Sequence, residues 1–216
     1  MTVRLVMPTG TRIGWIGTGV MGSSMCGHLL TAGYRVTIHS RTQSKAQSLL
    51  DRGAQWAENP RAAATQSDVI FTMVGFPQDV HTVYFDETGV FAGARAGMIL
   101  VDMTTTQPSL SRDIAAAASA NNLSAIDAPV SGGDVGAKNA SLSIMAGGET
   151  TSVQAVIERA AFFAPTSPPE TGASIADRPF AEAAAAMSRL KEGCVVVMSM
   201  RVVPAPAPEK TPSVPK

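Results

Sequence analysis

Cysteine and net charge are both scarce in this sequence of 216 residues. The two cysteines, Cys26 and Cys194, lie far apart and in no metal-like spacing. This argues against a disulfide framework or a metal site and favours a reducing compartment, so we expect a cytoplasmic protein. The 17 basic and 17 acidic residues give a formal net charge of +0, which argues against a nucleic-acid partner.

Long apolar runs are absent as well. The longest one late in the sequence, Cys194–Met200, ends at Arg201 and is much too short to span a bilayer. Near the other end, Met1–Gly10 has a single basic residue, Arg4, and Pro8 interrupts it before an apolar run can form. We interpret that segment as a leader strand or a frayed end rather than a secretion signal, and we expect no membrane partner.

Short apolar runs alternate with helix-like stretches up to about Ala164. The expected strands are 12–16, 35–39, 68–74, 98–102, 123–127 and 142–146, and the expected helices are 20–32, 44–52, 78–85 and 107–121. The run at 68–74 is almost continuously apolar, which is typical of a strand covered on both faces. The alternation predicts an α/β fold of the Rossmann type over residues 1–164, doubly wound around a mainly parallel sheet.

The composition changes after Ala164, because 9 of the 14 prolines lie between Pro165 and Pro215. Proline removes a backbone donor and blocks helix growth. Residues 165–216 are therefore predicted to form an irregular, proline-rich tail. Within it, Phe180–Glu192 is a plausible single helix that Gly193 would end.

A glycine-rich loop lies between the first expected strand and the first expected helix. It has the spacing G-x-G-x-x-G at Gly17, Gly19 and Gly22. An ordinary glycine-rich turn is the alternative, but a preceding strand and a following amphipathic helix are the context that dinucleotide binding requires. The predicted cofactor-binding residues of this loop are Gly17, Thr18, Gly19, Val20, Met21 and Gly22.

The end of the second expected strand lacks an acidic residue. Domains that bind NAD usually have Asp or Glu there, to hold the ribose hydroxyls, whereas this chain has no carboxylate before Asp51. Arg41 offers a planar cation instead, and Ser40, Thr42 and Lys45 add donors suited to a 2′-phosphate. We therefore expect Ser40, Arg41 and Thr42 to bind NADP, with NAD as the second choice; a solvated loop arginine is the alternative.

Four stretches together resemble one enzyme family. They are GWIGTGVMGSSM at 14–25, FTMVGFPQDV at 71–80, VDMTTTQPS at 101–109 and DAPVSGGDVGA at 127–137. In order and spacing they look like the β-hydroxyacid dehydrogenases, which include 3-hydroxyisobutyrate dehydrogenase, tartronate semialdehyde reductase and, more distantly, 6-phosphogluconate dehydrogenase. The resemblance covers the chain from about Arg12 to Gly148. It implies hydride transfer between NADP and a small β-hydroxyacid.

The resemblance also implies roles for residues at the matching positions. Val74 and Gly75 would lie along the path of the cofactor, Asp79 would be a polar residue on the nicotinamide side, and Thr105 would contact the nicotinamide ribose. The loop Ser131, Gly132 and Gly133 would hold the substrate carboxylate, because a Ser-Gly-Gly turn offers a hydroxyl and unhindered N–H donors to an anion. A merely flexible turn is the alternative for this loop.

The catalytic lysine of the family has no match in the sequence. In the family it lies on an all-helical second domain, in the motif G-x-x-G-x-x-x-K-x-x-N. Here the lysines after Lys138 are Lys191, Lys210 and Lys216, and no asparagine follows Asn139. We therefore assign no catalytic residue, and we expect the helical domain to be missing.

Three functions remain open at this stage. The first is the NADP-binding domain of a hydroxyacid oxidoreductase, and the second is a catalytically inactive NADP-binding module or a truncated fragment. The third, a protein that uses FAD or a methyl donor, is disfavoured by the length of the family resemblance. The sequence does not predict the oligomeric state or the particular hydroxyacid.

Overall fold

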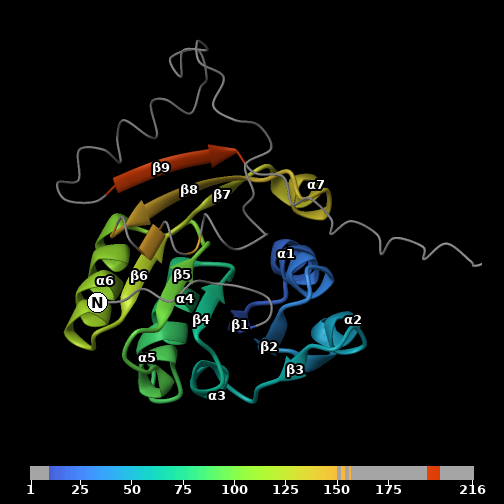
Figure 1. Ribbon diagram of the computed structural model, residues 1–216, viewed down its shortest axis with the longest axis horizontal. Helices are drawn as coiled ribbons and strands as arrows, with labels where there is room; N and C mark the ends of the chain where they lie inside the picture. The colour runs from blue at the N-terminus through green and yellow to red at the C-terminus, as the bar shows by residue number, and fades with distance from the viewer. Residues whose placement is uncertain (1–9, 150–151, 154–155, 157–193, 200–216) are drawn as a thin grey trace, which may run out of the picture.

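A central sheet of nine strands organises the molecule (Figure 1). The structure is a computed structural model, and it describes residues 10–149, 152–153, 156 and 194–199. The strands are β1 (Arg12–Ile16), β2 (Arg35–His39), β3 (Gln55–Trp56), β4 (Val69–Thr72), β5 (Ile99–Asp102), β6 (Ser124–Asp127), β7 (Val130–Ser131), β8 (Ser143–Gly148) and β9 (Cys194–Ser199). Their order is β3-β2-β1-β4-β5-β6-β8-β7, with β9 paired to the other edge of β8.

The first six strands pair in parallel with one another, and the strand order reverses direction between β1 and β4. This is the 3-2-1-4-5-6 order of a doubly wound Rossmann-type sheet, so the predicted fold class is confirmed. The helices that connect the strands are α1 (Val20–Thr31), the 3₁₀ turn η1 (Gln43–Ala46), α2 (Gln47–Leu50), α3 (Pro60–Thr65), α4 (Pro77–Phe85), α5 (Val90–Gly93), α6 (Pro108–Ala120) and α7 (Gly133–Lys138).

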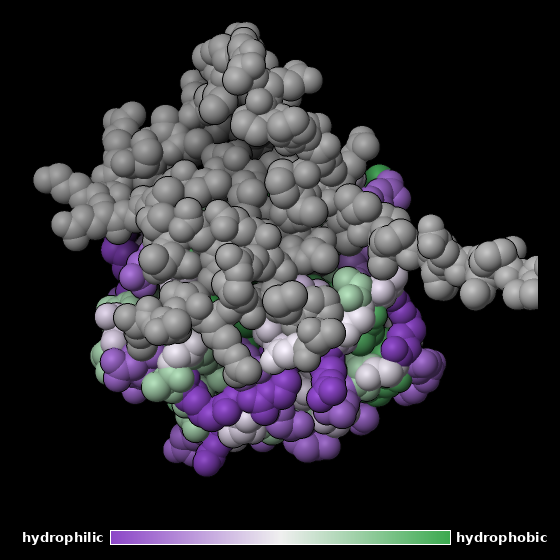
Figure 2. Space-filling view, viewed as in Figure 1, coloured by the Kyte–Doolittle hydropathy of each residue, from purple (hydrophilic) through white to green (hydrophobic). Residues whose placement is uncertain are grey.

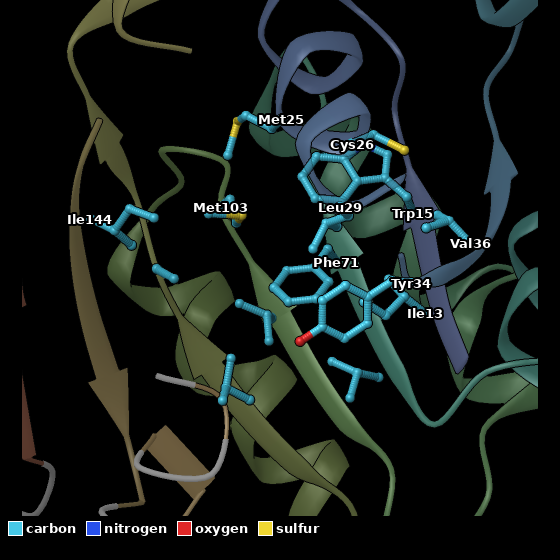
Figure 3. Packing of buried hydrophobic residues seen from close by; sticks show 14 of the residues in the cluster. Ile13, Trp15, Met25, Cys26, Leu29, Tyr34, Val36, Phe71, Met103 and Ile144 are labelled. Atoms are coloured by element: carbon cyan, nitrogen blue, oxygen red, sulfur yellow. The ribbon is translucent and has the colours of Figure 1, made fainter. Parts of the chain in front are cut away.

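Two separate cores cover the two faces of the sheet. In β4, Phe71 belongs to the core beneath α1, whereas its neighbour Ile70 belongs to the core beneath α4 and α6. Figure 3 shows the first core, in which Trp15 lies beside Leu29 of α1 and its ring stacks on Phe71 at 5.6 Å between centroids. Because successive side chains point to opposite faces, a strand buried on both sides must be apolar throughout, as 68–74 predicted.

Proline fixes where three of the helices begin. Helices α3, α4 and α6 each have proline in the first turn, where its missing N–H costs nothing. Asn59 also caps α3, since its side-chain oxygen accepts a 2.8 Å hydrogen bond from the N–H of Ala62. The start predicted for the helix at Pro108 is therefore confirmed.

The structure differs from the expectations at the last strands. Strand β8 covers most of the strand expected at 142–146, for which no direction was predicted, and it is antiparallel to β6, β7 and β9. Residues 194–199, expected in an irregular tail, form β9. The predicted helix Phe180–Glu192 lies outside the described residues.

Among the residues that the structure describes, no helix is both long enough and apolar enough to cross a bilayer. In the view of Figure 2, hydrophilic residues gather along the lower edge of the described surface, interspersed with apolar ones. This mixture is ordinary for a sheet whose two apolar faces are already covered by helices.

Candidate functional site

A cavity of about 890 Å³ lies at the carboxyl ends of β1, β2 and β4. This is the point where the strand order reverses, and open α/β sheets bind their ligands there. The cavity is lined by all of the predicted cofactor residues except Thr105: Gly17, Thr18, Gly19, Val20, Met21, Gly22, Ser40, Arg41, Thr42, Val74, Gly75 and Asp79. The structure therefore brings three segments that are distant in the sequence to one site.

The three glycines of the loop have different surroundings. Gly17 has φ +98°, and a Cβ built on it would lie 2.1 Å from the carbonyl oxygen of Met73 at the end of β4. A Cβ on Gly22 would lie 2.1 Å from the carbonyl oxygen of Gly17, so α1 packs directly on the turn that precedes it. Gly19 differs from both, because a Cβ there would meet no atom within 4 Å. The backbone at Gly19 thus faces open space.

Trp15 fixes the carbonyl group of Gly17. The indole Nε1 of Trp15 donates a 2.8 Å hydrogen bond to this oxygen. The N–H of Gly17 in turn donates to the carbonyl of His39 at 2.9 Å, which ties the loop to the end of β2. Both polar groups of Gly17 are therefore fixed, and the turn out of β1 has one defined shape.

The loop fits the pyrophosphate of a dinucleotide. Helix α1 begins at Val20, and the N–H groups of its first turn have no acceptor within the helix. These groups and the positive end of the helix dipole favour an anion at this position. The hydroxyl oxygen of Thr18 is buried and has no hydrogen-bond partner among the described residues. The open face of Gly19 leaves room for the phosphate oxygens that would use these donors.

Arg41 and Asp79 meet at the end of β2. The Arg41 Nη1 atom lies 3.2 Å from Asp79 Oδ1, and the Arg41 side chain is 83% exposed while that of Asp79 is 20% exposed. This contact joins Asp79 of α4 to the residues that follow β2. The sequence had no signal for the pair, since 38 residues separate its members.

Several lining residues were not predicted. Glu58, Asn59 and Pro60 reach the cavity from the β3–α3 connection, and Thr82, Val83, Asp86 and Thr88 reach it from α4 and the turn after it. Strand β3 has only two residues, which is too short for an apolar period. Lys45, which the sequence did suggest as a donor, also lines the cavity.

Thr105 and the loop Ser131, Gly132 and Gly133 do not line this cavity. Gly132 and Gly133 have φ +127° and +61°, and helix α7 begins at the second of them. The other end of α7 is tied to α1, because the ring of His28 makes a 2.8 Å hydrogen bond with the carbonyl oxygen of Ala137. The loop is thus fixed to the same helix that carries the glycine-rich turn.

A buried acidic pair lies at the carboxyl ends of β5 and β6. Asp102 and Asp127 are partners in the parallel register. Asp102 Oδ1 accepts hydrogen bonds from the Thr72 hydroxyl at 2.8 Å and from the Thr104 N–H at 3.0 Å. Burial raises the pKa of Asp102, and burial together with the charge of Asp102 raises the pKa of Asp127 to about 6.

Thr104, which donates its N–H to Asp102, also links neighbouring strands. The Thr104 hydroxyl accepts a 3.0 Å hydrogen bond from the N–H of Val74, which joins the end of β5 to the wall of the cavity. Thr104 thus contacts Val74, one of the residues that line the cavity. Thr105 is exposed.

The strand order, the glycine-rich turn at the reversal point and the cavity above it define a Rossmann-type dinucleotide-binding domain. Residues 12–162 match the family described as the NAD binding domain of 6-phosphogluconate dehydrogenase, and the chain belongs to this family. Its site is therefore a nicotinamide-dinucleotide site.

Several curated relatives are named as dehydrogenases. An Arabidopsis thaliana protein named "Probable 3-hydroxyisobutyrate dehydrogenase-like 1, mitochondrial" is 59% identical over 151 residues, which cover 69% of this chain and 45% of that protein. The 3-hydroxyisobutyrate dehydrogenase of Pseudomonas aeruginosa is 35% identical over 138 residues, covering 64% of this chain and 46% of the relative. The chain thus spans about half the length of the curated relatives it matches.

Solved structures agree with this fold. A structure described as Psf3 in complex with NADP+ and 2-OPP has a TM-score of 0.67 and 30% identity, covering 70% of this chain and 54% of the other. The 3-hydroxyisobutyrate dehydrogenase of Mycobacterium tuberculosis with L-serine has a TM-score of 0.64 and 30% identity, covering 70% of this chain and 50% of the other.

Proposed function

We propose that this chain binds NADP in preference to NAD and is the cofactor domain of an oxidoreductase that acts on a small β-hydroxyacid. The observation that carries the proposal is Arg41, which lines the cavity directly after β2, a strand that itself ends without a carboxylate. A guanidinium matches the geometry of a phosphate and attracts its negative charge. The structural relative with NADP+ bound is consistent with this choice.

Different residues of the cavity would bind different parts of the cofactor. The first turn of α1 and the open backbone at Gly19 would receive the pyrophosphate. Arg41, with Ser40, Thr42 and Lys45, would hold the 2′-phosphate of the adenosine half. The nicotinamide, once bound, supplies hydride transfer, and the protein orients it against the substrate.

Ser131, Gly132 and Gly133 are the proposed substrate-binding residues. Two consecutive glycines with positive φ leave the backbone N–H groups unhindered, which suits a carboxylate. The loop follows β6 at the same edge of the sheet as the cavity, and α7 fixes it to α1. Two relatives are named for 3-hydroxyisobutyrate, and one solved relative contains L-serine. We therefore propose a small hydroxyacid, with Thr105 on the nicotinamide side.

A catalytically inactive NADP-binding module is the second candidate. It is favoured by one observation: the lysine motif of the family has no match in this sequence. A positioned acid or base typically contributes roughly 10²–10⁴-fold to such reactions. We expect the isolated chain to bind the cofactor and to turn over hydroxyacids very slowly.

Two measurements on the full chain test these proposals. Titration with NADPH and NADH, followed by cofactor fluorescence, should give tighter binding of NADPH. Turnover with 3-hydroxyisobutyrate, glycerate and 6-phosphogluconate should be far below the rates of about 1–10³ per second that are usual for enzymes. Equal affinity for both cofactors would contradict the NADP preference, and a rate in the usual range would contradict the inactive module.

We also propose that the protein works in a reducing compartment, with the cytoplasm as the expected one. Cys26 is completely buried in the core, and burial raises its pKa to about 12, so this thiol stays protonated and unreactive. Imaging the full chain with a fluorescent tag, in cells with labelled organelles, tests the location; accumulation inside an organelle would contradict it.

A further inference from the structure

Asp79 places a carboxylate on the wall of the cavity opposite β2. It lies in the first turn of α4, where the positive end of the helix favours a negative charge. Its Oδ1 atom pairs with Arg41, whereas its Oδ2 atom is buried and has no hydrogen-bond partner among the described residues. A Cβ built on Gly75 would lie 3.3 Å from Oδ2, so this oxygen is close to the backbone of the cavity wall.

The acidic residue that is missing from the second strand is thus present from another element. In NAD-binding domains a carboxylate at the end of that strand accepts hydrogen bonds from the ribose hydroxyls. Here β2 ends without one, but Asp79 of α4 lines the same cavity and contacts the guanidinium of Arg41 at 3.2 Å. The cavity therefore holds, side by side, a cation that suits a phosphate (Arg41) and a carboxylate that suits a hydroxyl (Asp79).

The other charged side chains of the cavity differ from Asp79. Lys45, Glu58 and Asp86 line it but are exposed, so water and salt screen their charges. The side chain of Asp79 is only 20% exposed. Among the described acidic residues that line the cavity, Asp79 therefore acts most strongly on a ligand group beside Arg41.

We propose that Asp79 determines cofactor specificity, and that the Arg41–Asp79 pair lets one cavity accept both NADP and NAD. With NADP bound, Arg41 faces the 2′-phosphate while Asp79 repels it, because the phosphate carries more than one negative charge at pH 7. With NAD bound, Asp79 accepts a hydrogen bond from the ribose 2′-hydroxyl. Asp79 thus lowers the preference that Arg41 creates. The inference rests on the proposed function.

A merely structural role makes a different prediction. If Asp79 served only to orient the exposed side chain of Arg41, its loss would weaken NADPH binding and leave NADH binding unchanged. If it determines specificity, loss of its charge strengthens NADPH binding and weakens NADH binding. The ratio of the two affinities therefore moves in opposite directions in the two cases.

The test compares Asp79→Asn with the wild-type chain by fluorescence titration of NADPH and NADH. Asp79→Asn should raise the preference for NADPH by about fivefold or more, since the lost repulsion strengthens NADPH binding and a neutral amide oxygen accepts the ribose hydroxyl less strongly than a carboxylate does. Asp113→Asn makes the same change of net charge on the exposed face of α6 and should leave the ratio unchanged. An unchanged or smaller ratio in Asp79→Asn would overturn the proposal.

Two further variants keep the result interpretable. Asp79→Ser also removes the charge while keeping a residue suited to a first helical turn, and it replaces Asp79→Asn if the latter does not fold. Arg41→Ala tests the proposed function separately, because it should abolish the preference for NADPH whatever Asp79 does. A wild-type chain that binds neither cofactor would overturn both proposals. If Arg41→Ala abolishes the preference for NADPH but Asp79→Asn leaves the ratio of affinities unchanged, this proposal alone is overturned.

Discussion

Trp15 and Gly17 are joined by a 2.8 Å hydrogen bond from the indole Nε1 to the carbonyl oxygen, directly beneath the cofactor loop. Trp15 is completely buried and the hydrogen bond is partly buried, so this oxygen would lose its donor if the indole were removed. A buried acceptor left without a partner costs about 1–3 kcal/mol. The stability of the domain and the shape of its loop therefore depend on the same contact.

Trp15→Phe should lower both thermal stability and NADPH affinity, the latter by about threefold to tenfold if roughly 1 kcal/mol of loop order is lost. Trp56→Phe is the matched control, because the Trp56 Nε1 has no hydrogen-bond partner among the described residues. Calorimetry and fluorescence titration of both variants check this. Equal effects of the two substitutions would show that ring size, rather than the Gly17 contact, is what matters.

Gly17→Ala and Gly19→Ala should separate folding from binding. Alanine at Gly17 meets the Met73 carbonyl at a positive φ, so unfolding should become easier by about 3 kcal/mol or more. Alanine at Gly19 meets no protein atom within 4 Å, so stability should change by less than about 1 kcal/mol.

In Gly19→Ala the methyl group would instead occupy the space proposed for the pyrophosphate, and NADPH affinity should fall by about tenfold or more. Denaturant unfolding and NADPH titration give the two quantities for each variant. A Gly19→Ala chain that binds NADPH normally would place the pyrophosphate elsewhere.

Arg41→Asp should reverse the proposed cofactor preference. The substitution removes a charge-assisted contact, which is worth about 1.5–3 kcal/mol, and it adds a like charge beside the phosphate. NADPH affinity should therefore fall by more than about tenfold, while NADH affinity changes little or improves. Titration with both cofactors measures this. Equal losses for the two would mean that Arg41 supports the fold or the pyrophosphate.

Asp127→Asn should stabilise the domain at neutral pH more than at acidic pH. The pKa of Asp127 is about 6 in the folded chain, whereas an unfolded aspartate has a pKa of about 4. Between these values the folded state binds more protons, so stability falls as the pH rises and then stays lower above pH 6. Burial is the main cause, and the negative charge of Asp102 adds to it.

The advantage of Asp127→Asn over the wild type should therefore grow by up to about 2–3 kcal/mol between pH 4 and pH 7. Thermal unfolding at several pH values measures it, with exposed Asp113→Asn as the surface control. A stability difference that does not depend on pH would contradict a raised pKa at Asp127.

The sequence predicted those parts of the fold whose signal is local. The apolar run of β4 and the glycine spacing before α1 each depend on adjacent residues, and both are present where expected. The direction of β8 could not be predicted, because side-chain alternation is the same in parallel and antiparallel strands. β3 was missed because two residues show no period.

The candidate site shows the same division. The loop Gly17–Gly22 and the residues after β2 could be found from motifs, since each motif lies on one turn. The contact between Arg41 and Asp79 depends on how α4 packs beside β2, and no short motif records such packing. The expected place of Asp79 on the nicotinamide side of the site stays a prediction.

Every residue that lines the cavity lies between Ile16 and Thr88. In the order of synthesis on the ribosome, this lining is complete before β5, β6 or the Ser131 loop has been made. The cavity wall formed by β4 cannot form until the chain has been synthesised beyond residue 69, because β1 pairs with β2 on one side and with β4 on the other. A nascent chain thus acquires its proposed cofactor contacts before its proposed substrate contacts, and cofactor bound at that stage would stabilise the half-made sheet by mass action.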